Sequence, residues 1–367
     1  MNERPSLSDA ERLDRLRLIR SENVGPVTFR RLLDRFGTAS AALRALPDLA
    51  RHGGRRSVHV CSIAEAEAEL EAIDRCGARL IIFGDDAYPA LLAEIEDAPA
   101  SLTVIGDVGL LRRASIAVVG SRNASLNGRR LAYDIARDIG IGGLVVVSGM
   151  ARGIDAEAHR GELPNGTVAV LAGGVDVCYP LENAQLYARV REQGTLLSEV
   201  PPATAPQARH FPRRNRLISG LAQGVVVVEA NLRSGSLITA RMAAEQGREV
   251  FAVPGSPLDP RARGCNDLLR QGAILTESAA DVLGQLRAPI AASRPLAQPA
   301  PLPGIDDAET DEARRVVAET LSPTPVAVDE IIRTCQLSPA QVSTILLEWE
   351  LAGRLERHAG NKVSLIG

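Results

Sequence analysis

Between residues 80 and 253 the chain alternates short apolar segments with longer amphipathic ones, and this pattern restricts the fold more than any other feature. The apolar segments are too short for buried helices and are rich in valine, isoleucine and leucine: residues 80–83, 102–105, 116–119, 144–147, 168–171, 195–198, 225–228 and 249–253. Amphipathic segments such as 128–139, 182–193 and 236–246 lie between most of them. Apolar strands alternating with helices are typical of a parallel sheet covered on both faces. We therefore predict a doubly wound α/β domain over residues 61–287.

The first 60 residues have a different, helical pattern. An apolar stripe is followed by a turn at Gly25-Pro26, a helix ending near Gly37 and a short helix from Thr38 to Leu43. A helix, a glycine turn and a second helix resemble a SAM-like or helix-hairpin-helix module, whose turn amides can contact a phosphate. The alternative, which we favour, is a helical docking domain without DNA contact.

The last 80 residues are predicted to form a linker and a small domain. Residues 288–307 are rich in proline and alanine without periodicity, which is typical of an extended linker. Residues 308–367 predict three helices and a β-hairpin, the pattern of a winged helix. Its third helix carries Glu348 and Glu350 and no cation before Arg354. Because a helix in the major groove needs positive charge, we predict that this domain docks to a protein or to the chain's own sheet domain.

An arginine cluster precedes one of the predicted strands. Arg209, Arg213, Arg214 and Arg216 lie just before the strand at 225–228, and a small-residue loop at 234–236 opens a helix near Leu237. A buried strand that leads into such a loop and a helix N-terminus provides free amide groups for an anion. Neighbouring arginines indicate that this anion is a phosphate.

Other polar residues follow the predicted strands at the same edge of the sheet, where ligands of open parallel sheets bind. Together with the cluster they form our predicted DNA-binding set: Gly120, Ser121, Arg122, Gly149, Arg152, Arg213, Arg214, Asn215, Arg216, Ser234, Gly235 and Ser236. Asp155 and His159 are four residues apart, so we expect them to pair and support the site. Glu199 and Glu229 are expected to orient arginines, although catalytic carboxylates are the alternative.

Composition excludes several classes of function. The net charge of −3 means that any nucleic-acid contact is a local patch. The five cysteines and five histidines are scattered, so we expect no disulfide framework and no metal site. No P-loop, nucleophile elbow or full dinucleotide fingerprint occurs, and we expect no cofactor. The charged N-terminus and the lack of a long apolar run predict a cytoplasmic protein.

The motifs as a group resemble the DNA-processing protein A family, DprA or Smf. The resemblance covers roughly residues 80–280 and rests on these segments: Tyr88-Pro89, VVGSR at 118–122, SGMARGID at 148–155 with His159, Tyr179-Pro180, Ser198-Glu199, FPRRNR at 211–216, VVEANLRSGSLITA at 227–240, VPG at 253–255 and GCNDLLRQGA at 264–273. It implies a Rossmann-like core that binds single-stranded DNA. It also implies a homodimer that protects incoming DNA in natural transformation, loads the RecA recombinase and is not an enzyme.

Two features qualify this interpretation. Lys362 is the only lysine, so contacts that relatives make with lysine must come from arginine or be absent. Only 3% of the residues are aromatic, which predicts a phosphate-dominated, sequence-indifferent and salt-dependent interaction. A nucleotide-binding or nucleotide-cleaving enzyme remains the alternative, with Asp155, Glu199 and Glu229 as carboxylates. A scaffold whose winged helix recruits a partner is a third possibility.

Overall fold

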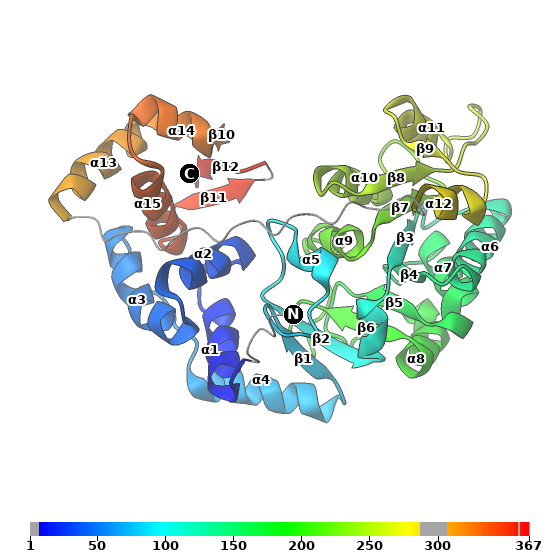
Figure 1. Ribbon diagram of the computed structural model, residues 1–367, viewed down its shortest axis with the longest axis horizontal. Coiled ribbons are helices and arrows are strands. Elements are labelled where there is room, and N and C mark those ends of the chain that lie inside the picture. The colour runs from blue at the N-terminus through cyan, green and yellow to red at the C-terminus, as the bar shows by residue number, and fades with distance from the viewer. Residues whose placement is uncertain (1–6, 287–306, 359, 367) are drawn as a thin grey trace. The chain divides into compact units, whose positions relative to one another are not determined.

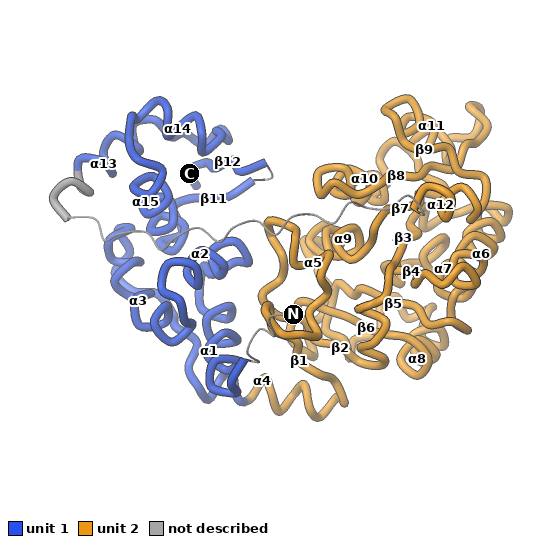
Figure 2. Tube along the Cα trace, in the orientation of Figure 1, with its two compact units in different colours: residues 1–67, 295–367 blue, residues 68–294 orange. Residues whose placement is uncertain are grey.

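The computed structural model describes residues 7–286, 307–358 and 360–366, and it divides into two compact units. Unit 1 comprises residues 1–67 and 295–367, and unit 2 comprises residues 68–294 (Figures 1 and 2). The predicted linker at 288–307 lies outside the described residues except for its last position. The finer division into 1–60, 61–287, 288–307 and 308–367 stays a prediction.

Unit 2 is built on one nine-stranded sheet in the order β1-β2-β6-β5-β4-β3-β7-β8-β9. Its strands are β1 (Arg79–Ile82), β2 (Ser101–Gly106), β3 (Ser115–Val119), β4 (Val145–Ser148), β5 (Thr167–Val170), β6 (Thr195–Ser198), β7 (Gly224–Val227), β8 (Glu249–Ala252) and β9 (Ile274–Leu275). All eight predicted strands are present, and the predicted α/β class is confirmed. The two-residue β9 was not predicted, because two apolar residues are too few to show the periodicity of a strand.

The sheet is not parallel throughout. From β6 to β9 every neighbouring pair is parallel, whereas β2 pairs antiparallel with both β1 and β6. The connection from β1 to β2 contains only the four-residue helix α5 (Ala90–Ala93) before the chain returns beside β1. The predicted doubly wound parallel sheet is therefore confirmed from β6 to β9, and β1 and β2 extend it by antiparallel pairing, which burial alone does not reveal.

Helices cover both faces of the sheet in unit 2 (Figure 1). One face packs against α5, α9, α10 and α11, and the other against α6, α7, α8 and α12. Their bounds are α6 (Leu126–Ile141), α7 (Ile154–Glu162), α8 (Ala184–Gln193), α9 (His210–Leu221), α10 (Gly235–Glu245), α11 (Arg263–Arg270) and α12 (Ala279–Leu286). The valines of β3, β4 and β7 are fully or almost fully buried between these layers. None of the described helices combines the length and apolarity that a membrane span requires.

Unit 1 contains the helical module and the winged helix. The module comprises α1 (Asp9–Arg20), α2 (Pro26–Phe36) and α3 (Ala39–His52), and α4 (Ile63–Arg75) follows it. The winged helix comprises α13 (Asp307–Thr320), β10 (Val326–Ala327), α14 (Val328–Cys335), α15 (Pro339–Leu351), β11 (Leu355–His358) and β12 (Lys362–Leu365). Helix α3 runs nine residues beyond its predicted end at Leu43, because Leu46, Leu49 and Ala50 continue its buried face.

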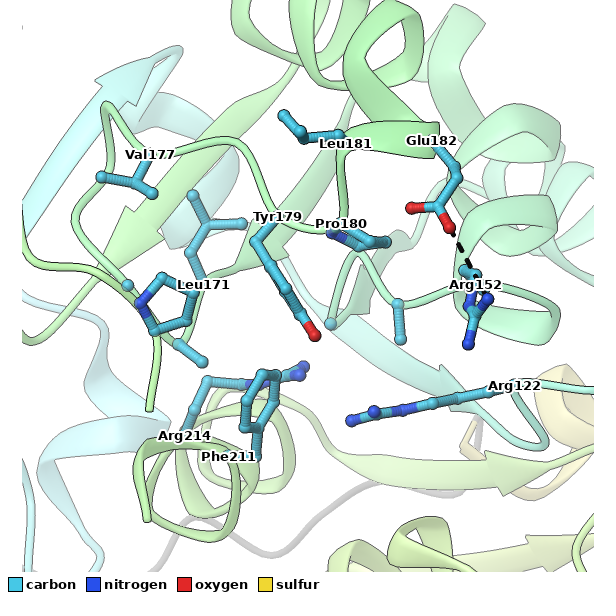
Figure 3. Close-up of a pocket in the computed structure, with 15 residues that line it drawn as sticks. Arg122, Arg152, Leu171, Val177, Tyr179, Pro180, Leu181, Glu182, Phe211 and Arg214 are labelled. Atoms are coloured by element: carbon cyan, nitrogen blue, oxygen red, sulfur yellow. Dashed lines mark ion pairs between the residues drawn. The ribbon is translucent and has the colours of Figure 1, made fainter. Parts of the chain in front are cut away.

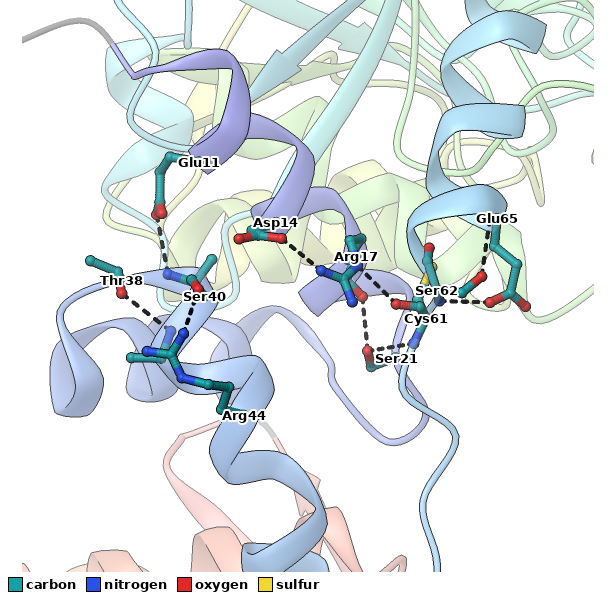
Figure 4. Close-up of polar contacts among 12 residues, drawn as sticks. Glu11, Asp14, Arg17, Ser21, Thr38, Ser40, Arg44, Cys61, Ser62 and Glu65 are labelled. Carbon is teal, nitrogen blue, oxygen red and sulfur yellow. Dashed lines mark hydrogen bonds and ion pairs between the residues drawn. The ribbon is translucent and has the colours of Figure 1, made fainter.

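Polar contacts fix the path of the chain through the helical module (Figure 4). Arg17 donates to the carbonyl of Cys61 over 3.0 Å, and the Ser21 hydroxyl accepts the Cys61 amide over 3.1 Å. The Glu11 carboxylate accepts the Ala39 amide at the start of α3 over 3.2 Å. These bonds connect α1 to α3 and to the segment before α4.

A buried acid between α6 and α7 makes the stability of unit 2 depend on pH. Glu162 is fully buried, and neither carboxyl oxygen has a hydrogen-bond partner within the described residues. Burial raises the pKa of Glu162 from 4.5 to about 8, although Arg113 and the Asn165 side chain oppose the rise. Between these two values the folded state binds more protons than the unfolded state, so stability is lost as pH rises.

Glu162→Gln should therefore stabilise the protein progressively from pH 5 to pH 8. Each pH unit in this window corresponds to about 1.4 kcal/mol, so we expect the difference between variant and parent to grow by about 2–4 kcal/mol. Urea unfolding at several pH values measures this difference. Glu157→Gln, on the same helix but in an ion pair with Arg160, is the control. A difference that does not change with pH would contradict the assignment.

Candidate nucleic-acid interface

The candidate site lies where the winding of the sheet reverses. β3 and β7 are hydrogen-bonded neighbours, but the chain passes through β4, β5 and β6 before it returns to β7. The connections after β3 and β7 lead to α6 and α10, which cover opposite faces of the sheet. This divergence opens a crevice at the carboxyl ends of the strands.

Two pockets lie along this edge of unit 2. The aromatic pocket has a volume of about 390 Å³ and is lined by residues that include Gly149, Arg152, Leu171, Tyr179 and Pro180. The serine pocket has a volume of about 480 Å³ and is lined by residues that include Gly120, Ser121, Asn215, Ser234, Gly235 and Ser236. Arg122, Ala151, Phe211 and Arg214 line both pockets. The two pockets therefore adjoin one another along one crevice, and each is large enough for a small ligand.

An aromatic cluster marks the junction of the pockets (Figure 3). The rings of Tyr179 and Phe211 are tilted, with centroids 5.7 Å apart, and the Arg122 guanidinium lies 5.1 Å from the Phe211 centroid. Tyr179 is 47% exposed, so its ring is available to a ligand. This arrangement provides a stacking surface next to a positive charge. The sequence did not mark either aromatic ring as a site residue, because only the low aromatic content of the chain was considered. Both residues stand in the family motifs Tyr179-Pro180 and FPRRNR at 211–216.

Two exposed arginines supply positive charge at the aromatic pocket. Arg122 follows β3, and Arg152 follows β4. Arg152 forms an ion pair of 3.6 Å with Glu182, and both side chains are more than half exposed. A solvent-exposed pair of this kind contributes little to stability. Arg152 can therefore exchange Glu182 for a phosphate at small cost.

Arg214 is a third arginine of the crevice, and it is buried. It projects from α9 with 6% of its surface exposed and lines both pockets. Burial lowers the pKa of Arg214 to about 10, and Asp155 opposes this shift while Arg122 adds to it. Burial also raises the pKa of Asp155, against the opposing effect of Arg214. The two groups thus stabilise each other's charge beneath the floor of the crevice.

His159 supports the same floor of the crevice. The sequence predicted that it pairs with Asp155, but in the structure its ring nitrogens have other partners. Its Nε2 accepts the Met150 amide over 3.3 Å, and its Nδ1 lies 2.9 Å from the Thr167 hydroxyl on β5. Burial, followed by Arg214, lowers the pKa of His159 to about 3, so the ring is neutral. His159 turns toward the sheet rather than along its own helix, and it fixes the loop after β4.

The arginine cluster lies on α9, so its members point in different directions. Arg213 is exposed and lines a small pocket with His210. Arg216 is buried and ion-paired with Glu199 over 2.5 Å and with Asp97 over 3.3 Å. Glu199 thus orients an arginine, but that arginine lines neither of the two large pockets. Because neighbouring residues of a helix point in different directions, the helical structure of α9 gives these arginines different roles. The sequence pattern did not reveal this helix.

The serine pocket is bounded by the N-terminus of α10. Ser234 is the N-cap residue, and its hydroxyl accepts the Ser236 amide and lies 2.7 Å from the Ser236 hydroxyl. The Asn215 side chain of α9 donates to the carbonyl of Gly235 over 3.4 Å. The predicted loop at 234–236 therefore faces α9 and opens the predicted helix.

Two contacts hold the loop after β3 against its neighbours, one to the segment after β7 and one to the loop after β4. The Glu229 carboxylate accepts from the amide and the hydroxyl of Ser125, over 2.9 and 2.6 Å, so it positions α6 rather than an arginine. Gly153 has a φ of +75°, and a Cβ at this position would overlap the carbonyl of Ser121. Only glycine allows this close approach without strain.

Ten of the twelve predicted binding residues line the two pockets of the crevice; Arg213 lines only the adjoining small pocket, and Arg216 lines none of the three. Within residues 7–286, 307–358 and 360–366, no three His, Cys, Asp or Glu side chains are grouped to hold a metal ion. The arrangement combines arginines, stacked rings and a helix N-terminus. These features make the crevice of this Rossmann-like domain a candidate site for an anionic ligand.

Comparisons with known proteins agree with this class. The family model described as DNA recombination-mediator protein A matches residues 79–287. A DprA-like N-terminal HHH domain matches residues 9–72, and a DprA winged helix domain matches residues 298–361. The chain therefore belongs to the DNA-processing protein A family, DprA or Smf. The matches also confirm the predicted helical module and winged helix.

Individual relatives are similar over much of the chain. DNA processing protein DprA of Streptococcus pneumoniae is 46% identical over 203 residues, which are 55% of this chain and 72% of that protein. An X-ray structure of DprA from the same organism matches with a TM-score of 0.63 at 36% identity, over 76% of this chain and 98% of that one. DprA of Helicobacter pylori, whose structure concerns its single-stranded DNA binding mode, matches with a TM-score of 0.53 at 27% identity, over 57% of this chain and 95% of that one.

Proposed function

We propose that this protein binds single-stranded DNA in the crevice of unit 2, without sequence preference. The observation that carries the proposal is the meeting of Arg122, Arg214 and Phe211 at the junction of two pockets. Proteins that bind single strands combine a positive groove for the backbone with aromatic surfaces for the bases. The family relationship and the single-stranded DNA binding of the Helicobacter pylori relative support the same conclusion.

The residues of the crevice suit different parts of the strand. Arg122 and Arg152 are exposed and free to contact phosphates, as is Arg213 at the adjoining pocket. Tyr179 and Phe211 present ring surfaces on which a base can stack. The backbone and hydroxyl groups of 234–236 provide a third contact, at the opposite end of the crevice. None of these groups reads a base edge in a fixed geometry, so binding is expected to tolerate any sequence.

Fluorescence anisotropy of a labelled single-stranded oligonucleotide tests the proposal. We expect binding that weakens steeply between 50 and 200 mM salt, as it does when phosphate contacts release counterions. Unlabelled duplex of the same sequence should compete poorly. Equal competition by duplex, or no binding at low salt, would overturn the proposal.

Phe211→Ala tests the aromatic cluster separately from the charge. Stacking contributes about 1–3 kcal/mol per base, so we expect affinity for single strands to fall about tenfold or more. The dependence of affinity on salt should stay the same, because no charge is removed. Phe251→Ala is not a suitable control because that ring is in the core, so Phe36→Ala in unit 1 serves instead. Equal affinities of Phe211→Ala and the parent would exclude a stacked base at this position.

We further propose that the protein acts in natural transformation, where it protects incoming strands and loads RecA, and that it works as a homodimer. These roles are implied by membership of the family. Sedimentation of the full chain would measure the oligomeric state. RecA filament formation on strands precoated with a single-strand-binding protein would measure loading. A monomer, or no acceleration of filament formation, would contradict the respective role.

Hydrolysis of a nucleotide is the competing function, and the geometry favours it less. Glu199 pairs with Arg216, Glu229 binds Ser125, and Asp155 is buried beside Arg214. Each predicted carboxylate is therefore engaged in supporting the loops. We propose binding without chemistry. Release of a base or phosphate from a nucleotide incubated with the protein, lost on Asp155→Asn substitution, would reverse this conclusion.

A further inference from the structure

The two elements of unit 1 that resemble DNA-binding elements contact each other. The turn between α1 and α2 is the part of a helix-hairpin-helix that approaches a phosphate, and α15 is the helix of a winged helix that commonly enters the major groove. Here the Asn23 side chain in that turn donates to the carbonyl of Leu351 at the end of α15 over 2.9 Å. Asn23 has a φ of +61°, a conformation that asparagine tolerates.

Helix α3 extends this contact along α15. Gly53, directly after α3, lies so close to α15 that a Cβ would overlap the carbonyl of Glu348 and come within 2.8 Å of the Ala352 Cβ. In the other direction, Arg354 donates to the carbonyl of Gly53 over 3.2 Å, and its guanidinium lies 5.1 Å from the Trp349 ring centroid. Backbone-to-backbone approach of this kind is typical of a packed interface rather than a transient encounter.

The charges of both elements suit this contact and not a phosphate backbone. Glu348 is almost fully buried, where it pairs with Arg314 over 3.0 Å and lies 3.8 Å from His52 of α3. Glu350 pairs with Arg357 over 2.9 Å. Glu22, in the hairpin turn, accepts from Arg55 over 2.7 Å. Each of these three acids is thus partnered within the unit.

We infer that the helical module and the winged helix are docking partners within one chain, and that neither the hairpin turn nor α15 binds duplex DNA. The two ends of the chain then form a single folded body. This inference does not depend on the single-strand site of unit 2. The winged helix of this chain therefore docks to a surface formed by the α1–α2 turn and the end of α3.

Gly53→Ala in the full chain tests the contact. Gly53 has φ −72° and ψ −2°, so alanine fits the backbone and the substitution acts only through the crowding of α15. By hydrogen exchange we expect amides in both 39–52 and 339–351 to exchange at least tenfold faster, with β3 and β7 unchanged. Gly284→Ala, in α12 of unit 2, is the control for the added methyl group, because a Cβ there meets nothing within 4 Å. Unchanged exchange of 339–351 in the Gly53→Ala variant would overturn the inference.

A milder variant keeps the test valid if Gly53→Ala fails to fold. Asn23→Gly preserves the positive φ and removes the bond to Leu351, so it should also speed exchange at the end of α15. In both variants we expect no gain in affinity for a duplex oligonucleotide. A tenfold gain would show that the contact conceals a duplex-binding surface, and it would overturn our conclusion that these elements serve docking alone.

Discussion

Replacing both Arg122 and Arg152 with alanine should weaken single-strand binding about a hundredfold while the fold stays intact. Hydrogen bonds to charged groups contribute about 1.5–3 kcal/mol each, and about 1.4 kcal/mol corresponds to a factor of ten. Both side chains are exposed, and the Arg152–Glu182 pair adds little to stability. The slope of log affinity against log salt should decrease by about 1.4, since each phosphate contact on a single strand contributes about 0.7. Anisotropy titrations at four salt concentrations measure both quantities.

The matched control removes the same charge elsewhere on unit 2. Arg137 of α6 and Arg160 of α7 are similarly exposed and paired with local acids, and neither lines the crevice pockets. The Arg137→Ala, Arg160→Ala variant should keep nearly the affinity and salt slope of the parent. If the two double variants lose affinity equally, the binding reflects overall charge and the crevice is not its location. Glu182→Gln, which frees Arg152, is expected to change affinity in the opposite direction.

Gly149→Ala should both destabilise unit 2 and weaken single-strand binding, although it adds only one methyl group. A Cβ at position 149 would overlap Nη1 of Arg214 and lie 2.8 Å from the Asp155 carboxylate. Arg214 must then leave its buried position, and the buried Asp155 loses the favourable electrostatic interaction with that guanidinium. Leaving a buried charge uncompensated typically costs about 3–5 kcal/mol. We expect a loss of this order in urea unfolding and at least a tenfold loss of single-strand affinity.

Gly284→Ala, in α12, is the control for the added methyl group, because nothing lies within 4 Å of a Cβ there. Circular dichroism at the temperature of the binding assay separates loss of the crevice from loss of the fold. If Gly149→Ala unfolds at the same urea concentration as the parent and binds equally well, Arg214 does not occupy the position between the pockets. That result would remove the buried arginine from the proposed site.

Much of the architecture follows from local sequence pattern. The strands were predictable because four consecutive apolar residues between turn-forming residues have few alternatives to a buried strand, and 225–228 illustrates this within one residue of β7. The start of α15 was predictable because Ser338 and Pro339 form a local capping signal, which the structure shows as a complete capping box. The edge of the sheet that carries the candidate site followed from topology alone, since parallel strands end together.

The roles of individual residues depended on tertiary structure. Arg213, Arg214 and Arg216 are equivalent in the sequence, but on α9 one is exposed, one lies beneath the crevice and one pairs with Glu199. The directions of these three side chains are set by the turn of α9 and by the way α9 packs on the sheet. Neither can be recognised from the neighbouring residues in the sequence. Sequence by itself therefore determined which segments form elements and at which edge polar groups gather. Only the packing of distant segments decided which groups meet there, because burial and ion pairing are set by neighbours far apart in the chain.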